Sequence, residues 1–221
     1  MAGSWSFRVQ AQMQKPFYRQ KLPHKQSYNA TYFVTYRLYG SVPISVIKQL
    51  QMEYEQSLKE LIKNKQYTTA NEYKLQKKYF VQFDTFLDTN LNEPHWLQQT
   101  EIAQVVYDSL LHLDTTTIDL HCFTIMSNHV HALFDINDNN TDLYKIMQSH
   151  KSFTAKKCNG ILQREGPFWE PESYDHIIRV GEFDKIVNYT LLNSVKAGLV
   201  KKWEDWKWTY LAEYPEAPAS G

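Results

Sequence analysis

Two extended segments, separated by only two residues, stand at the centre of the chain. Residues 118–126 and 129–136 are rich in β-branched and aromatic side chains, and Ser127 and Asn128 lie between them. Short polar residues of this kind favour a tight turn, so the two segments are expected to pair as an antiparallel hairpin. Any fold of this chain therefore contains an antiparallel sheet.

Strands and helices alternate on both sides of this hairpin. Residues 31–38 are β-branched and aromatic throughout and are predicted to form a buried strand. Apolar residues at helical spacing predict four helices, over 44–63, 101–113, 142–160 and 182–197. A further strand is predicted over 174–180. This order predicts an α+β domain with a ferredoxin-like antiparallel sheet and helices on one side.

A single domain with extensions fits the length of 221 residues. The domain is expected over 28–210, with a helical insertion at about 64–97, where a polar stretch precedes an aromatic run. Residues 1–27 contain five basic residues and no acidic one, so they are expected to form a basic N-terminal arm. Residues 211–221 are assigned to a C-terminal tail.

Composition argues against membrane and secreted classes. No uninterrupted apolar run approaches the ~18 residues that a membrane span needs, and the N-terminus lacks the features of a secretory signal. The two cysteines, Cys122 and Cys158, form no CxxC pair, which suits a reducing compartment. We therefore expect a cytoplasmic protein without a membrane partner. Lys+Arg and Asp+Glu both total 24, so net charge gives no sign of a nucleic-acid binder.

Two short patterns place chemically active side chains together. His129 and His131 are i and i+2 in a predicted strand, so both imidazoles face one side about 6.5–7 Å apart and can meet one cation, while Val130 points into the core. Tyr189 and Asn193 are i and i+4 in a predicted helix, which puts a phenol and an amide on one face. Each pattern has an ordinary alternative, namely sheet histidines with common hydrogen bonds and a buried tyrosine.

In combination, these motifs resemble a known family. Residues 121–131, His-Cys-Phe-Thr-Ile-Met-Ser-Asn-His-Val-His, resemble the Ile-Met-Pro-Asn-His-Val-His signature of REP-associated tyrosine transposases, in the HUH single-strand transposase superfamily. Residues 167–200 resemble the family segment that ends in Tyr-Ile-x-x-Asn-Pro-Val-Lys-Ala-Gly-Leu-Val. Weaker similarity covers 32–43, 84–92 and 146–159. Ser127 and Ser194 stand where the family usually has proline, which alters rigidity more than chemistry.

The resemblance implies a metal-dependent endonuclease and strand transferase that acts on single-stranded DNA. It assigns His129, His131 and Asn193 to the metal and Tyr189 to the nucleophile, with a 5′-phosphotyrosine intermediate. A free phenol has a pKa near ~10 and attacks poorly at neutral pH, so it needs a cation that polarises the phosphate. A neutral set of two histidines and one asparagine suits Mg²⁺ or Mn²⁺.

The implied partner is a single-stranded DNA hairpin of the REP type, bound by a monomer. The candidates for phosphate contacts are Arg37, Lys151, Lys156, His176, Arg179 and Lys196, although each alone is more often an ordinary surface residue. Three alternatives stay open: a hairpin-binding regulator with little or no cleavage, a replication initiator or relaxase of the same superfamily, and a metal-dependent hydrolase of small molecules that uses a water nucleophile.

Overall fold

The centre of the molecule is one antiparallel sheet. The computed structural model describes residues 30–90, 94–137 and 142–213. The strands are β1 (Thr31–Arg37), β2 (Ile118–Ile125), β3 (His129–Ile136), β4 (Tyr174–Ile177) and β5 (Thr209–Leu211). They lie in the order β4-β1-β3-β2-β5, with every pair antiparallel. The predicted α+β class and the β2–β3 hairpin are confirmed.

The described part of the chain contains five helices. They are α2 (Ile44–Lys63), α3 (Thr69–Thr89), α4 (Thr100–Asp114), α5 (Leu143–Ile161) and α6 (Phe183–Lys196), with short 3-10 turns at Trp96–Gln98 and Trp203–Asp205. Their ends follow local chemistry. The Asp142 side chain caps α5 by accepting a hydrogen bond from the Lys145 amide at 2.7 Å. Gly198 follows α6 with φ +73°, a conformation that glycine adopts without strain.

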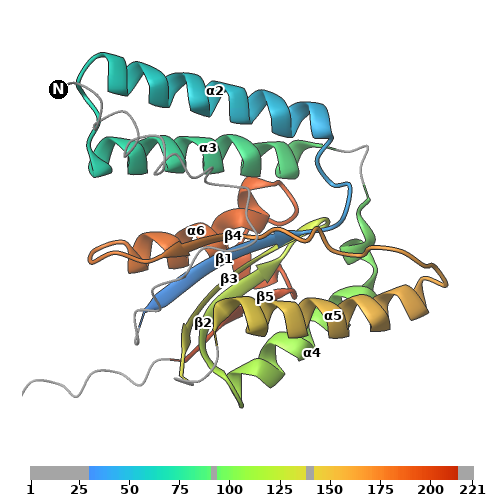
Figure 1. Ribbon diagram of the computed structural model, residues 1–221. Coiled ribbons are helices and arrows are strands. Elements are labelled where there is room, and N and C mark those ends of the chain that lie inside the picture. Colours follow the sequence, from blue (N-terminus) through green and yellow to red (C-terminus); the bar gives the residue numbers. More distant parts are fainter. Residues whose placement is uncertain (1–29, 91–93, 138–141, 214–221) are drawn as a thin grey trace, which may run out of the picture.

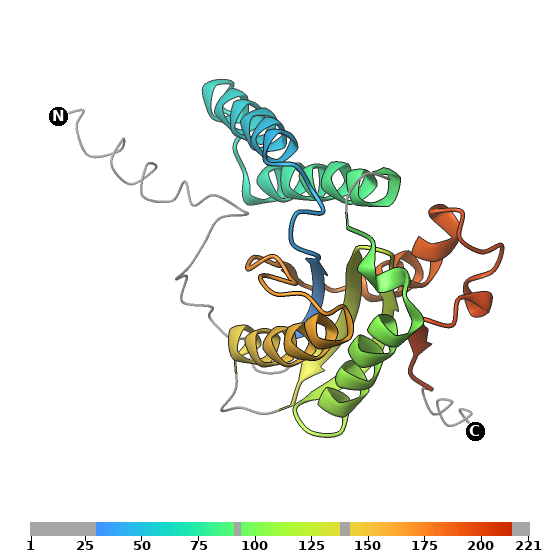
Figure 2. The ribbon, with the colours of Figure 1, turned by 90° about the vertical axis from the view of Figure 1, so that its right-hand side faces the viewer.

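One face of the sheet packs on α4 and α5. Tyr32, Val34 and Tyr36 alternate along β1 and are buried on this face, in one core with Ile102 and Val106 of α4. Figure 1 shows α4 and α5 together on this side, and the turned view in Figure 2 shows them lying next to each other. This layer is the main hydrophobic core and holds the sheet rigid behind the opposite face.

The opposite face is covered as well, by α3 and α6. Phe33 of β1 and Leu133 of β3 pack there with Phe80 of α3 and Leu191 of α6. The expectation of helices on one side only was therefore wrong. The reason lies in β1 and β3, which are buried on both faces along most of their length and so need a second covering layer.

The described residues of the stretch 64–97, expected as a helical insertion, contain α3 and the start of the 3-10 turn at Trp96–Gln98. α2 packs against α3 through Tyr54, Leu58 and Tyr79, and Figure 1 shows this helix pair stacked outside the sheet. The C-terminal part of α3 reaches the sheet, where Asp84 lies next to His129 and His131. No helix within 30–90, 94–137 or 142–213 is both long and apolar enough to cross a bilayer.

The segment between α6 and β5 returns to the core. Trp208 is buried and the Trp206 indole donates to the Ile125 carbonyl at 3.0 Å. The basic arm over 1–27 and most of the tail over 211–221 lie outside the described residues.

Truncation of Ile102 tests the α4 layer. Ile102 is fully buried against the sheet, whereas Ile44, at the start of α2, is 70% exposed. Ile102→Ala is expected to lower the free energy of unfolding by about 2–5 kcal/mol, because it leaves a cavity in the main core. The matched change Ile44→Ala should stay within about 0.5 kcal/mol in the same urea titration. Equal losses would contradict the described packing.

Candidate metal centre and nucleophile

His129 and His131 lie side by side on the face of β3 that α3 and α6 cover. Both side chains are fully buried, and their Nε2 atoms are 3.1 Å apart. Val130 between them is buried on the other side of the strand, in the main core. The spacing of the two histidines thus has the consequence that the sequence predicts, a shared face.

Asn128 fixes the orientation of the His129 ring. The Asn128 amide nitrogen donates to the Leu87 carbonyl of α3 at 3.0 Å, so its Oδ1 faces His129 Nδ1 at 2.7 Å. An amide oxygen can only accept, so Nδ1 carries the hydrogen. His129 Nε2 is left with its lone pair directed at the centre of the site, which is the tautomer of a metal ligand.

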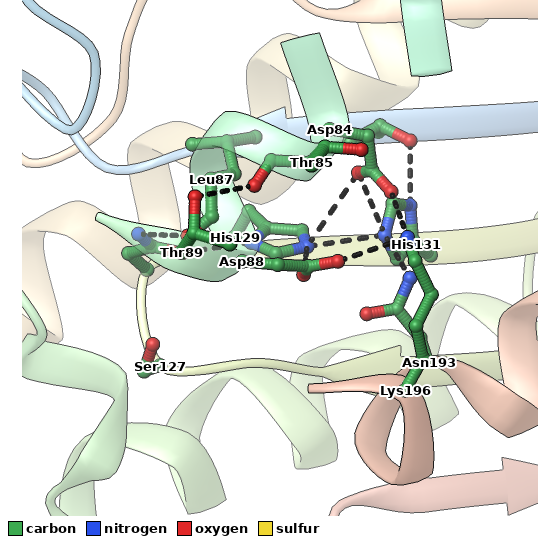
Figure 3. A network of polar contacts seen from close by, with 12 residues as sticks. Asp84, Thr85, Leu87, Asp88, Thr89, Ser127, His129, His131, Asn193 and Lys196 are labelled. Atoms are coloured by element: carbon green, nitrogen blue, oxygen red, sulfur yellow. Dashed lines mark hydrogen bonds and ion pairs between the residues drawn. The ribbon is translucent and has the colours of Figure 1, made fainter. Parts of the chain in front are cut away.

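His131 is held by β1. Its Nδ1 is hydrogen-bonded to the Thr35 hydroxyl at 2.7 Å, and the Phe33 ring stacks against it with centroids 5.6 Å apart. These contacts turn Nε2 of His131 toward the same point as Nε2 of His129 (Figure 3). Partners on Nδ1 that orient the ring are typical of histidine ligands of metals.

Asp84, on α3, completes a group that sequence reasoning missed. Its side chain is fully buried, with Oδ1 3.2 Å from His131 Nε2 and 3.8 Å from His129 Nε2. One ligand atom from each of these three residues lies within 4.8 Å of the others, a geometry able to hold a metal ion. The ligand set expected from the sequence, two histidines and an asparagine, therefore lacked a carboxylate.

Asp84 was treated as part of an insertion, yet α3 carries a signal that points to it. Asp84 and Asp88 are i and i+4 on the apolar face of this helix, between Phe80, Phe83 and Leu87. A carboxylate on the buried face of a helix is costly unless it has a partner, so the spacing indicates a functional group. The weak family similarity over 84–92 includes both residues but assigns them no role.

The electrostatics of the site follow from burial. Burial alone would raise the pKa of Asp84, but the charge and hydrogen bond of His131, the nearby His129 and the Tyr189 hydroxyl outweigh it and hold the pKa well below its ordinary value. Burial, with the neighbouring His131, lowers the pKa of His129 to about 3. At neutral pH the site therefore combines a carboxylate with a neutral imidazole, the forms that bind a cation.

α6 brings Tyr189 and Asn193 to the same group. The Asn193 amide nitrogen lies 3.1 Å from His131 Nε2, and its buried Oδ1 has no hydrogen-bond partner among the described residues. The Tyr189 hydroxyl donates to Asp84 Oδ2. Burial and the negative charge of Asp84 raise the pKa of Tyr189 far above its ordinary value. The phenol is thus held in its protonated form by a carboxylate that also faces the histidines.

The donors present fit a hard divalent cation. Two imidazole nitrogens and one carboxylate oxygen come together in a fully buried cluster, and the buried Asn193 amide lies beside them. Oxygen ligands suit Mg²⁺ and Mn²⁺, and nitrogen ligands are better tolerated by Mn²⁺. The carboxylate makes the set anionic, which strengthens its attraction for a cation compared with a neutral set.

Comparison with known proteins identifies the fold. No family model matches the chain, and a search of curated proteins finds no match. Among solved structures, a REP-associated tyrosine transposase bound to a REP hairpin is similar, with a TM-score of 0.53 and 14% sequence identity over 86% of this chain and 82% of that chain. The chain has the fold of a REP-associated tyrosine transposase. At this identity the likeness concerns the fold, and the chemistry has to be argued from the site.

The six candidates for phosphate contacts do not lie together. The first group, Lys196 and Arg37, is near the metal centre. Lys196 lies 3.0 Å from Asp88 and 3.7 Å from Asp84. Arg37 is on the same strand face as Thr35 but is paired with Glu170 at 3.1 Å. Of these two, Lys196 is the more exposed, with 47% of its side chain accessible compared with 11% for Arg37.

The second group consists of residues with structural contacts away from the centre. The Lys151 ammonium donates to three carbonyl oxygens in the segment 170–172, at 3.0–3.5 Å. His176 is hydrogen-bonded to Tyr73 at 2.7 Å, and the Arg179 guanidinium lies 3.5 Å from the centroid of the same tyrosine ring. The contacts of His176 and Arg179 tie β4 and the loop after it to α3.

Lys156 stands apart from both groups. It is exposed on α5, across the sheet from the metal centre. The structure therefore brings His129, His131, Asn193, Tyr189 and Lys196 together and does not bring Lys156 to them.

Cation binding should be visible as thermal stabilisation. Mn²⁺ at a hundred times its Kd is expected to stabilise the protein by about 2.7 kcal/mol, because the ligands converge only in the folded state. Asp84→Asn and His131→Ala should each abolish the shift in Tm measured by calorimetry. Asp108→Asn, a change on the exposed side of α4, is the matched control and should retain it. A shift that persists in both site variants would place the cation elsewhere.

Proposed function

We propose that this protein is a metal-dependent endonuclease and strand transferase that cuts single-stranded DNA next to hairpins through a 5′-phosphotyrosine intermediate. One observation carries the proposal. The Tyr189 hydroxyl donates to the carboxylate of Asp84, and that carboxylate lies against His129 and His131. A potential nucleophile thus lies next to a potential cation site, and phosphodiester attack by a phenol needs a cation nearby.

In this proposal four side chains hold Mg²⁺ or Mn²⁺: Asp84, His129, His131 and Asn193. The chemistry that a divalent cation supplies in such a site is polarisation of the scissile phosphate and stabilisation of the phenolate. Asn128 and Thr35 orient the two imidazoles through Nδ1. The rigid sheet behind β3 keeps these ligands in place before DNA binds.

Tyr189 performs the bond-making step. Its oxygen attacks the phosphorus, and the bond from phosphorus to the 3′-oxygen breaks. The phosphate at the new 5′ end of the DNA is then joined to Tyr189 as a phosphotyrosine. Asp84 Oδ2 already accepts the hydrogen bond of the phenol and would pass its proton on to solvent, while the departing 3′-oxygen takes a proton from water and becomes a free 3′-OH. Attack of a 3′-OH on the phosphotyrosine reverses these changes, so strand transfer needs no ATP.

The proposed DNA partner is a single-stranded hairpin. The similar solved structure is a tyrosine transposase bound to a REP hairpin, and Lys196 places an exposed positive charge beside the nucleophile. The protein is proposed to act as a monomer, since Tyr189 and all four ligands come from one chain.

A second candidate function is a hairpin-binding regulator with little or no cleavage. It is favoured by the raised pKa of Tyr189, because a phenol held by a buried carboxylate is a weak nucleophile until a cation changes its environment. The two candidates share the DNA and differ in whether a covalent product forms.

A covalent adduct separates these candidates. Incubation with Mn²⁺ and a labelled hairpin oligonucleotide is expected to give a product that migrates as protein plus DNA on a denaturing gel and disappears after protease treatment. Tyr189→Phe removes the attacking oxygen alone and should lose this product while hairpin binding persists.

Tyr174→Phe is the matched control for this experiment. Tyr174 stacks on Phe80, which in turn lies beside Tyr189, so the change removes a neighbouring hydroxyl from the same layer. This variant should still form the adduct. If Tyr189→Phe cut as well as the parent, water or another residue would be the nucleophile, and if the parent formed no adduct, the regulator would be the better account.

Recognition of structured single strands is tested by binding. Affinity for a hairpin from the DNA flanking the gene should exceed affinity for a duplex of the same sequence, and it should fall as salt rises, because phosphate contacts release counterions. Deletion of residues 1–27 should weaken binding, since this segment has five basic residues and no acidic one. Fluorescence anisotropy measures both effects, and equal affinity for hairpin and duplex would remove the proposed specificity.

A further inference from the structure

Lys196 lies at the open edge of an otherwise buried site. Its ammonium donates to Asp88 Oδ2 at 3.0 Å and lies 3.7 Å from Asp84 Oδ2, and almost half of its side chain is exposed. It stands on α6 three residues after Asn193 and seven after Tyr189, so the three side chains share one helical face. Lys196 is therefore in contact with solvent on one side and with the carboxylates of the metal centre on the other.

Asp88 brings a second carboxylate to this centre. It lies one helical turn after Asp84 on α3 and is 5% exposed. While its Oδ2 binds Lys196, its buried Oδ1 has no hydrogen-bond partner among the described residues and lies 3.8 Å from His129 Nε2 (Figure 3). The Asp88 carboxylate thus joins Lys196 to the histidine pair.

The charges of this group oppose one another in a way that limits what can bind. Two buried carboxylates attract a cation, and one ammonium partly satisfies both of them. A divalent cation held by Asp84 would repel Lys196 and weaken its hold on the carboxylates, because the two positive charges would lie within a few ångströms of each other. Once released, an exposed lysine beside the nucleophile is free to bind an anionic oxygen.

We propose that Lys196 exchanges partners during the reaction: it pairs with Asp84 and Asp88 until a divalent cation binds, and it then moves to a non-bridging oxygen of the DNA phosphate. Cation binding thereby prepares a phosphate contact next to Tyr189. The proposal rests on the proposed function for the identity of the phosphate. Its first half, the competition between Lys196 and the cation, concerns this chain alone.

A purely structural role for Lys196 predicts the opposite result. If the lysine only clamps α6 to α3, its loss would let Asn193 and Asp84 move apart and would weaken cation binding. If the lysine competes with the cation, its loss removes a positive charge from the site and strengthens cation binding. The sign of the change therefore decides between the two roles.

The experiment is a calorimetric titration of the full chain with Mn²⁺, without DNA. Lys196→Gln is expected to tighten Mn²⁺ binding by roughly five- to tenfold, the effect of removing one partly exposed charge near the site. Lys185→Gln is the matched control, because Lys185 is also an exposed lysine on α6 but belongs to its first turn, and it should leave the affinity unchanged. Unchanged or weaker binding in Lys196→Gln would overturn the proposal.

Chemical labelling gives an independent measure of the release of Lys196 from the carboxylates of Asp84 and Asp88. Acetylation of the parent protein followed by mass spectrometry should show Lys196 reacting faster once Mn²⁺ is added, whereas Lys185 reacts at the same rate with and without it. Equal reactivity of Lys196 under both conditions would mean that the lysine keeps its carboxylates and that no exchange takes place.

Hairpin binding tests the second half of the proposal, the contact between Lys196 and the DNA phosphate. With the non-cleaving Tyr189→Phe protein, adding Lys196→Gln should weaken hairpin affinity in the presence of Mn²⁺ and leave it unchanged in the presence of a chelator. An equal loss under both conditions would contradict the exchange. Failure of the proposed function appears separately, as absence of the covalent adduct in the parent protein, while the Mn²⁺ titration and the labelling still report on Lys196.

Discussion

The buried carboxylate of Asp84 is the constraint on which the site depends. A charge without solvent contact is unfavourable unless other groups compensate it, and here the compensating groups are His131, His129 and the Tyr189 hydroxyl. Each comes from an element that must therefore meet α3 at one point. The ionised side chain of Asp84 therefore requires α3 and α6 to come together on β3.

The two covering layers of the sheet have different tasks. The layer of α4 and α5 forms the main hydrophobic core and supports the strands from behind, whereas the layer of α3 and α6 combines an aromatic cluster with the metal centre. Phe33 and Phe80 surround His131 and Tyr189 with rings. Exclusion of water by these rings strengthens every electrostatic interaction at the centre, including the one that holds the phenol proton.

Local sequence patterns predicted the features that depend on residues close together in the chain. Alternation and turn residues predicted the β2–β3 hairpin, and strand and helix periodicities placed His129 beside His131 and Tyr189 beside Asn193. The spacing of Asp84 and Asp88 on the apolar face of α3 indicates a functional carboxylate, but its partners were missed because the contact between α3 and β3 is not encoded in any periodicity. The covering of both faces was missed for a related reason, since the doubly buried strands β1 and β3 show their need for a second layer only once the sheet order is known.

We propose that Asp84, His129, His131 and Asn193 hold one divalent cation beside Tyr189. A crystal grown with Mn²⁺ and measured at the manganese absorption edge tests this most directly. A single anomalous peak is expected within coordination distance, about 2.0–2.3 Å, of Asp84 Oδ1 and both histidine Nε2 atoms. A fully soaked crystal with no peak between these side chains, or with its peak at another site, would contradict it.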